Sequence, residues 1–146
     1  MTHFQGSPKE IIALDAWIKL SRARNSVWKQ IKPSISVTGL SPSQFAVLEA
    51  LLHLGPLSQK EISKKLLVST GNVVTIIDNL ERDQLVTRES NPSDRRAHII
   101  VLTKKGKELI DTIFPDHVKA IVDTLSVLTK NEQLELDRLC KKLGLK

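Results

Sequence analysis

The sequence predicts a mainly α-helical fold with one small β-hairpin, an α+β chain. Apolar residues recur at three- and four-residue spacing along most of its 146 residues, which is the period of amphipathic helices. Four Ser/Thr-x-x-Glu/Gln boxes mark helix starts, and the period becomes extended only between residues 85 and 102. No linker or repeat interrupts the pattern, so residues 1–146 are expected to form a single domain.

Two helices are expected in the first third of the chain. Ser7-Pro8-Lys9-Glu10 is a capping box with proline at the first helical position, and apolar residues then follow at helical spacing. This first helix is expected to cover residues 8–32 and to end at Pro33. Ser41-Pro42-Ser43-Gln44 repeats the signal and opens a second helix, which Gly55-Pro56 ends.

A closely spaced pair of helices follows. Ser58-Gln59-Lys60-Glu61 opens a short helix, and Ser69 can cap another in which Val73, Ile76, Ile77 and Leu80 form the buried stripe. Only Leu67 and Val68 separate the two helices, so residues 58–84 read as a helix-turn-helix. The second helix of such a pair can lie in a DNA major groove.

Extended structure and two further helices complete the prediction. Residues 85–89 and 98–102 read as strands, with a turn at 90–94 and a wing loop over 90–97. Thr103 is the expected cap of a long helix that Pro115 would kink. A last capping box begins at Thr129, and the helix it opens ends at Gly144. Helices followed by a hairpin are the element order of a winged helix-turn-helix.

Composition argues against several classes of protein. No apolar run reaches the length of a membrane span, and the first residues lack the features of a secretion signal, so we expect a cytoplasmic protein without a membrane partner. The single cysteine, Cys140, excludes an internal disulfide and is expected to be a packed thiol. The four histidines are scattered, and no phosphate loop or nucleophile motif is present, so we predict no metal, no cofactor and no enzyme activity.

The charge distribution favours a polyanionic partner. The chain has 22 Lys and Arg against 16 Asp and Glu, a net charge of +6. Residues 1–55 and 56–105 carry +3 each, whereas residues 106–146 carry none of the excess. Five aromatic residues are few for a protein that stacks single-stranded bases, so double-stranded DNA is the better candidate.

Three segments after the start of the helix pair form a specific signature: Leu80-Glu81-Arg82-Asp83-Gln84-Leu85-Val86, Asp94-Arg95-Arg96 and Leu102-Thr103-Lys104-Lys105-Gly106. They resemble the MarR (multiple antibiotic resistance regulator) family of winged helix-turn-helix transcription factors. The resemblance implies dimerisation helices at 8–32 and 104–144, which flank a winged lobe at 41–103 with its wing at 85–103. It further implies a homodimeric regulator, expected to be an effector-responsive repressor of a pseudo-palindromic operator.

DNA contacts are expected at the start of the recognition helix, at the preceding helix and at the wing. Arg96 matches the family's arginine that enters the minor groove, Arg95 is the neighbouring tip residue, and Asp94 matches the aspartate that braces the wing. Thr75 departs from many relatives, which have arginine there. Ser69 could act only as a cap, and the lysines could simply be solvated. The remaining candidates are Ser69, Thr70, Gly71, Asn72, Thr75, Lys64 and Lys65.

Three aromatic residues are candidates for a small-molecule effector pocket. Trp17, Trp28 and Phe45 could form its floor, although packing alone also explains apolar residues at these helical positions. A second function stays open at this stage, because a winged helix can also serve as a protein-interaction module that reads no DNA. Sequence-specific DNA binding separates the two hypotheses.

Overall fold

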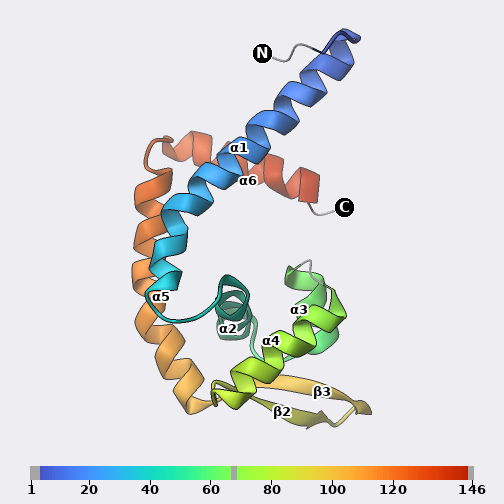
Figure 1. The fold of residues 1–146 in the computed structure, drawn as a ribbon, viewed down its shortest axis with the longest axis vertical. Coiled ribbons are helices and arrows are strands. Elements are labelled where there is room, and N and C mark those ends of the chain that lie inside the picture. The colour runs from blue at the N-terminus through green and yellow to red at the C-terminus, as the bar shows by residue number, and fades with distance from the viewer. Residues whose placement is uncertain (1–3, 67–68, 145–146) are drawn as a thin grey trace. The chain divides into compact units, whose positions relative to one another are not determined.

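The computed structural model describes residues 4–66 and 69–144, and at Thr70, Arg95 and Arg96 it describes the backbone alone (Figure 1). The predicted fold class is confirmed. Two compact units make up the chain: Met1–Pro33 with Lys119–Lys146, and Ser34–Val118. The elements in chain order are α1 Pro8–Ser36, α2 Pro42–Leu54, β1 Leu57–Ser58, α3 Gln59–Leu66, α4 Thr70–Arg82, β2 Val86–Asn91, β3 Asp94–Leu102, α5 Lys104–Leu125 and α6 Lys130–Gly144.

The helix starts predicted from capping boxes are confirmed. At α3, the Glu61 backbone N–H donates to Ser58 Oγ at 3.2 Å, and the Ser58 backbone N–H donates to Glu61 Oε2 at 2.7 Å. The same reciprocal pair forms between Ser41 and Gln44 at the start of α2. Each box satisfies N–H groups that the helix itself leaves without a partner, which is why the pattern predicts these starts so well.

The predicted end of the first helix at Pro33 is wrong. Helix α1 continues to Ser36 with Pro33 inside it. The additional turn buries Ile35, which is 2% exposed, and this burial offsets the backbone hydrogen bond that proline cannot make. The chain leaves the helix at Gly39, whose φ of +78° suits glycine. The kink expected at Pro115 stays a prediction, and α5 is continuous through that residue.

Residues 34–118 form the winged lobe, which has its own apolar core. Helices α2, α3 and α4 pack on one another, and the sheet packs against them (Figure 1). The core residues come from every one of these elements. Its fully buried side chains include Phe45, Leu48, Ile62, Val73, Ile77, Leu80 and Ile100.

The sheet has three strands, in the order β1-β3-β2. Strand β1 was not predicted, because two residues give no periodic signal. In the structure, Leu57 of β1 pairs with Ile100 of β3. The predicted loop over 90–97 is also wrong, since β3 already begins at Asp94 and pairs there with Asn91. The Ser93 backbone N–H donates to Asn91 Oδ1 at 2.9 Å and tightens the turn. The register shifts between Ser90 and Asn91, as expected of a bulge at a hairpin tip.

The other unit combines α1 up to Pro33, the end of α5 and α6. Helix α6 has no buried residue among those described, and its leucines are exposed, including Leu139 at 43%. A groove of about 440 Å³ runs between α1 and α6 and is lined by Ala13, Ala16, Trp17, Leu20, Leu136, Leu139, Cys140 and Leu143. In the part of the chain that the structure describes, no helix has the length and apolarity to cross a membrane.

Candidate nucleic-acid interface

Helix α4 is amphipathic and offers a polar surface at its start. Val73, Ile77 and Leu80 are completely buried on one side. Ser69, Gly71, Asn72 and Thr75 are exposed. Ser69 is confirmed as the N-cap, since its Oγ accepts the Asn72 backbone N–H at 3.3 Å. The buried stripe therefore fixes the rotation of the helix, and this rotation presents its first turns to solvent.

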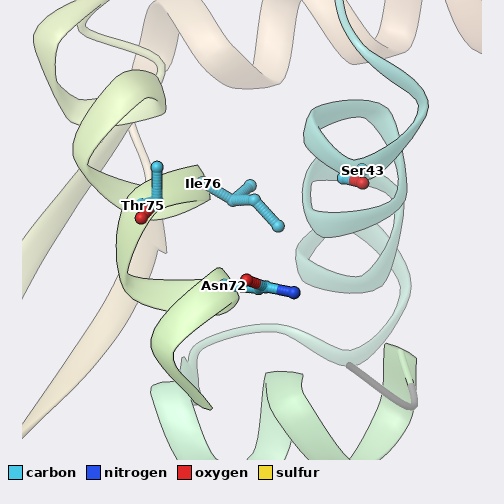
Figure 2. A pocket seen from close by; sticks show the side chains of 4 residues that line it. All are labelled: Ser43, Asn72, Thr75 and Ile76. Atoms are coloured by element: carbon cyan, nitrogen blue, oxygen red, sulfur yellow. The ribbon is translucent and has the colours of Figure 1, made fainter. Parts of the chain in front are cut away.

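A shallow cleft lies between the start of α4 and α2. Figure 2 shows Asn72 and Ile76 pointing from α4 toward the side of Ser43, near the start of α2. The cleft has a volume of about 280 Å³, and Thr75 completes its lining. Thr75 Oγ1 donates to the Gly71 carbonyl at 3.4 Å. Sequence reasoning missed Ser43, although its place after the cap and proline of α2 already put it in an exposed first turn.

Gly71 is not required by the fold. A Cβ built on this residue would meet no atom within 4 Å, and its φ is not positive. Glycine in a helix costs up to about 1 kcal/mol relative to alanine, so the chain carries this cost without an internal packing reason. An open backbone on an exposed helix start suits the close approach of another molecule.

The other predicted contact residues are distributed around this helix start. Lys64 and Lys65 are exposed in the last turn of α3. Asp94 is exposed at the start of β3, and its bracing role stays a prediction. The backbone places Arg95 and Arg96 next to it in β3 and Thr70 in the first turn of α4, but these three side chains lie outside the described part. The N-terminal turn of α4, the end of α3 and the hairpin all belong to the winged lobe.

The base of the wing is anchored through Thr103 and Gly106. Thr103 Oγ1 donates to the Gln84 carbonyl at 2.7 Å and accepts the Gly106 backbone N–H at 2.9 Å. A Cβ on Gly106 would lie 1.9 Å from the Leu85 carbonyl oxygen, so only glycine fits. Gln84 has a φ of +61°, which turns the chain from α4 into the hairpin. The Leu102–Gly106 motif thus joins the start of α5 to the turn after α4.

Arg88 on β2 is paired inside the lobe. Its guanidinium donates to Asp78 and Glu81 of α4, and its side chain is 20% exposed. Partial burial disfavours the charged form of Arg88, but the hydrogen bonds that its guanidinium donates to Asp78 and Glu81 outweigh this effect and raise the pKa of Arg88. Arg82 differs, because its side chain is 71% exposed and pairs with its neighbour Asp83. The pairing of Arg88 with two carboxylates of α4 could not be predicted from the sequence.

His117 on α5 is buried in the same lobe. Its Nδ1 lies 2.9 Å from Ser34 Oγ, and its ring centroid lies 4.6 Å from that of Phe45. Burial lowers the pKa of His117, and the negative charge of Glu49 opposes this effect. The histidine is 5% exposed and thus forms part of the core around Phe45.

The three candidate effector residues have different surroundings. Phe45 is 2% exposed in the core of the winged lobe, where packing accounts for it. Trp17 is 65% exposed and lines the groove on α1, and Trp28 is half-buried on the same helix. The expectation of a packed thiol is wrong for the single chain, because Cys140 is exposed on the wall of that groove.

These features define the chain as a winged helix-turn-helix protein: a capped α4 with a polar start, a preceding α3 and a hairpin in one lobe. The MarR family model matches residues 40–98, which cover most of this lobe. MhqR, an HTH-type transcriptional regulator of Bacillus subtilis (strain 168), is 37% identical over 133 residues, covering 91% of this chain and 92% of MhqR. The chain belongs to the MarR family, and it is a DNA-binding transcriptional regulator.

Solved structures share the whole fold. AbsC, a MarR family regulator from Streptomyces coelicolor, matches with a TM-score of 0.82 at 22% identity, covering 98% of this chain and 96% of AbsC. BpsR of Bordetella bronchiseptica matches with a TM-score of 0.79 at 25% identity, covering 89% of this chain and 98% of BpsR. The DNA binding of BpsR is regulated by 6-hydroxynicotinic acid. These likenesses do not favour the protein-interaction module as the function of this chain.

Proposed function

We propose that the protein is an effector-responsive repressor that binds a pseudo-palindromic operator as a homodimer. The start of α4 enters the major groove, and the tip of the wing reaches the adjacent minor groove. The observation that carries the proposal is the exposed first turn of α4, where the buried stripe points Asn72 outward and Gly71 leaves the backbone open. A helix start also favours phosphates, because its N–H groups and dipole attract negative charge.

Each predicted contact has a distinct task in this proposal. Asn72 and Thr75 read base edges, with Thr70 and Gly71 at the same helix start. Ser69 combines its cap with a phosphate contact, and Lys64 and Lys65 on α3 neutralise phosphates. Arg96 enters the minor groove, Arg95 takes a phosphate and Asp94 braces the wing. In this proposal the protein acts in the cytoplasm.

We place the interface of the homodimer on the unit that contains α6. Its groove between α1 and α6 is lined mainly by apolar side chains, and exposed apolar surface of this kind marks an interface. A second copy of the chain would cover Trp17, Leu139 and Cys140. Substituting Leu139→Asp is expected to give monomers in sedimentation equilibrium, whereas Val127→Asp, at a residue 84% exposed in the turn before α6, leaves the dimer intact. A dimeric Leu139→Asp variant would refute this placement of the interface.

A small-molecule effector would act by favouring a dimer whose two α4 helices no longer match the operator spacing. The regulation of BpsR by 6-hydroxynicotinic acid supports a small aromatic acid as the first probe. Trp17 and Trp28, both on α1, remain the proposed contacts, whereas Phe45 is buried in the core of the winged lobe and is no longer a candidate. Because the chain has only two tryptophans, their fluorescence reports binding directly.

The decisive experiment is DNA binding by the Arg96→Ala variant. The dimer is titrated with a duplex from its own upstream region and with a random duplex, at two salt concentrations. Wild type is expected to prefer the upstream duplex, and Arg96→Ala to lose about 1–3 kcal/mol of specific binding. Equal affinity of wild type for both duplexes would reject the regulator in favour of a module that reads no DNA. Unchanged binding by the variant would remove the wing from the proposal.

A further inference from the structure

The contacts between α4 and β2 suggest how the recognition helix is held at a fixed position relative to the wing. Asp78 and Glu81 are three residues apart and therefore lie on one face of α4. Arg88 Nη2 donates to Asp78 Oδ1 at 2.5 Å, and Arg88 Nη1 donates to Glu81 Oε2. One planar guanidinium thus joins two carboxylates, a geometry that lysine cannot reproduce. We call Asp78, Glu81 and Arg88 the α4–β2 clamp.

A second bond makes the clamp depend on the backbone as well. The backbone N–H of Arg88 donates to Glu81 Oε1 at 3.2 Å, so Glu81 binds both the main chain and the side chain of the same residue. Strand β2 lies at the edge of the sheet, because the strand order is β1-β3-β2. The carboxylate of Glu81 therefore satisfies an N–H on the strand edge that no neighbouring strand can reach. This contact sets the position of β2 along α4.

Burial and charge also distinguish this arginine from a surface ion pair. The Arg88 side chain is 20% exposed, compared with 71% for Arg82. Exposed ion pairs contribute little to stability, whereas a partly buried arginine that bridges two carboxylates restricts all three side chains. Arg88 also offsets one of the two negative charges that Asp78 and Glu81 place on a helix that must approach DNA phosphates.

We propose that Arg88 is a positioning residue for DNA recognition, which fixes the angle between α4 and the wing through Asp78 and Glu81 without touching DNA. This inference rests on the proposed function. An operator has to be contacted by α4 and by the wing at the same time, so a loose connection between them weakens operator binding more than random binding. Non-specific binding depends mainly on phosphate neutralisation and tolerates the looseness.

The sharpest test is Asp78→Ala, because it separates an effect of charge from an effect of positioning. Loss of the negative charge favours DNA binding, whereas loss of the clamp weakens binding to the operator. Asp78 is 58% exposed, and alanine is favourable in a helix, so the variant should fold. Loss of a negative charge strengthens binding to any DNA, so affinity for a random duplex should stay equal or rise. If the clamp positions α4, the ratio of operator to random affinity should fall about fivefold to tenfold. An unchanged or higher ratio would overturn the proposal.

Arg88→Met and Arg82→Met form the matched pair of variants, since each removes one positive charge close to α4. Arg88→Met should lower the affinity ratio about tenfold, and Arg82→Met should leave it unchanged. The slope of log affinity against log salt should be the same for both variants. A slope that falls by about one in Arg88→Met alone, with the ratio preserved, would show a direct phosphate contact and refute positioning.

Amide hydrogen exchange in the free protein tests the clamp without DNA. The backbone amides at the end of α4 and along β2 should exchange faster in Arg88→Met than in Arg82→Met, including the amide of residue 88. Arg88→Lys provides the same comparison if the methionine variant does not fold. Unchanged exchange would overturn the proposal. If wild type shows no operator preference while the exchange result holds, the proposed function fails and the clamp stands.

Discussion

Substituting Gly71→Ala should make the protein more stable and a weaker DNA binder. The added methyl group would meet no atom within 4 Å, so it causes no steric cost in the free protein. Alanine is favoured over glycine in a helix by up to about 1 kcal/mol, and Gly71 stands in the first turn, where roughly half of that is expected. For a chain of this size, such a gain raises Tm by about 1–3 °C.

The same methyl group should hinder DNA. It projects from the exposed start of α4, where the proposal brings the backbone into contact with the duplex. Inserting a methyl group into a packed contact costs about 1–3 kcal/mol, which corresponds to roughly fivefold to 150-fold in affinity. Stability and affinity therefore move in opposite directions, which general destabilisation cannot produce.

Thermal unfolding and a fluorescence-anisotropy titration with the upstream duplex measure the two effects. Gly144→Ala is the matched control, because a Cβ there also meets nothing within 4 Å and the residue ends α6, outside the winged lobe. The oligomeric state is measured alongside. A Gly71→Ala variant that is more stable yet binds the operator as tightly as wild type would refute the close approach of DNA to this turn.

Two other predictions concern the stability of the winged lobe. Gly106→Ala should lower the free energy of unfolding, measured by chemical denaturation, by about 2–4 kcal/mol, because the new Cβ would lie 1.9 Å from the Leu85 carbonyl oxygen. A variant as stable as wild type would contradict this prediction. The lowered pKa of His117 means that the unfolded chain binds the proton more tightly, so stability is fully present above pH ~6.5 and is lost as the pH falls below that value. The loss of stability between about pH 7 and 5 should be smaller in His117→Gln than in wild type. It should be unchanged in His98→Gln, whose histidine is exposed and serves as the control. Equal pH profiles of stability for all three proteins would show that His117 is not the group responsible.

Local signals in the sequence predicted most of the fold. A capping box involves residues three apart, so Ser58 and Glu61 carry their information without reference to the rest of the chain. Strand β1 could not be found in this way, because Leu57 is extended through its pairing with Ile100, 43 positions further along. The continuation of α1 past Pro33 depends likewise on the burial of Ile35, which is 2% exposed and which the local sequence pattern does not reveal.

The candidate site was predictable to a similar extent. The polar start of α4 follows from the apolar stripe, so Asn72 and Gly71 could be placed on the exposed face from sequence alone. The α4–β2 clamp could not be predicted in this way. It depends on how α4 and β2 pack together, whereas the sequence gives only their order along the chain. Cys140 illustrates the same limit: the apolar stripe of its helix predicted burial, whereas none of the residues that the structure describes in α6 is buried.

The clamp also changes how the charge of the lobe should be interpreted. Asp78, Glu81 and Arg88 together carry −1, so the rest of residues 56–105 carries +4 rather than the +3 obtained for the whole segment. The first turns of α4, residues 70–77, contain no charged side chain, whereas Asp78, Glu81, Arg82 and Asp83 follow directly. The acidic groups therefore lie toward the end of the helix where its dipole is negative, and the positive end is left uncharged. A polyanion is consequently attracted to the N-terminal turn of α4 more than to its C-terminal turn, which supports the proposal that the N-terminal end of the helix faces DNA.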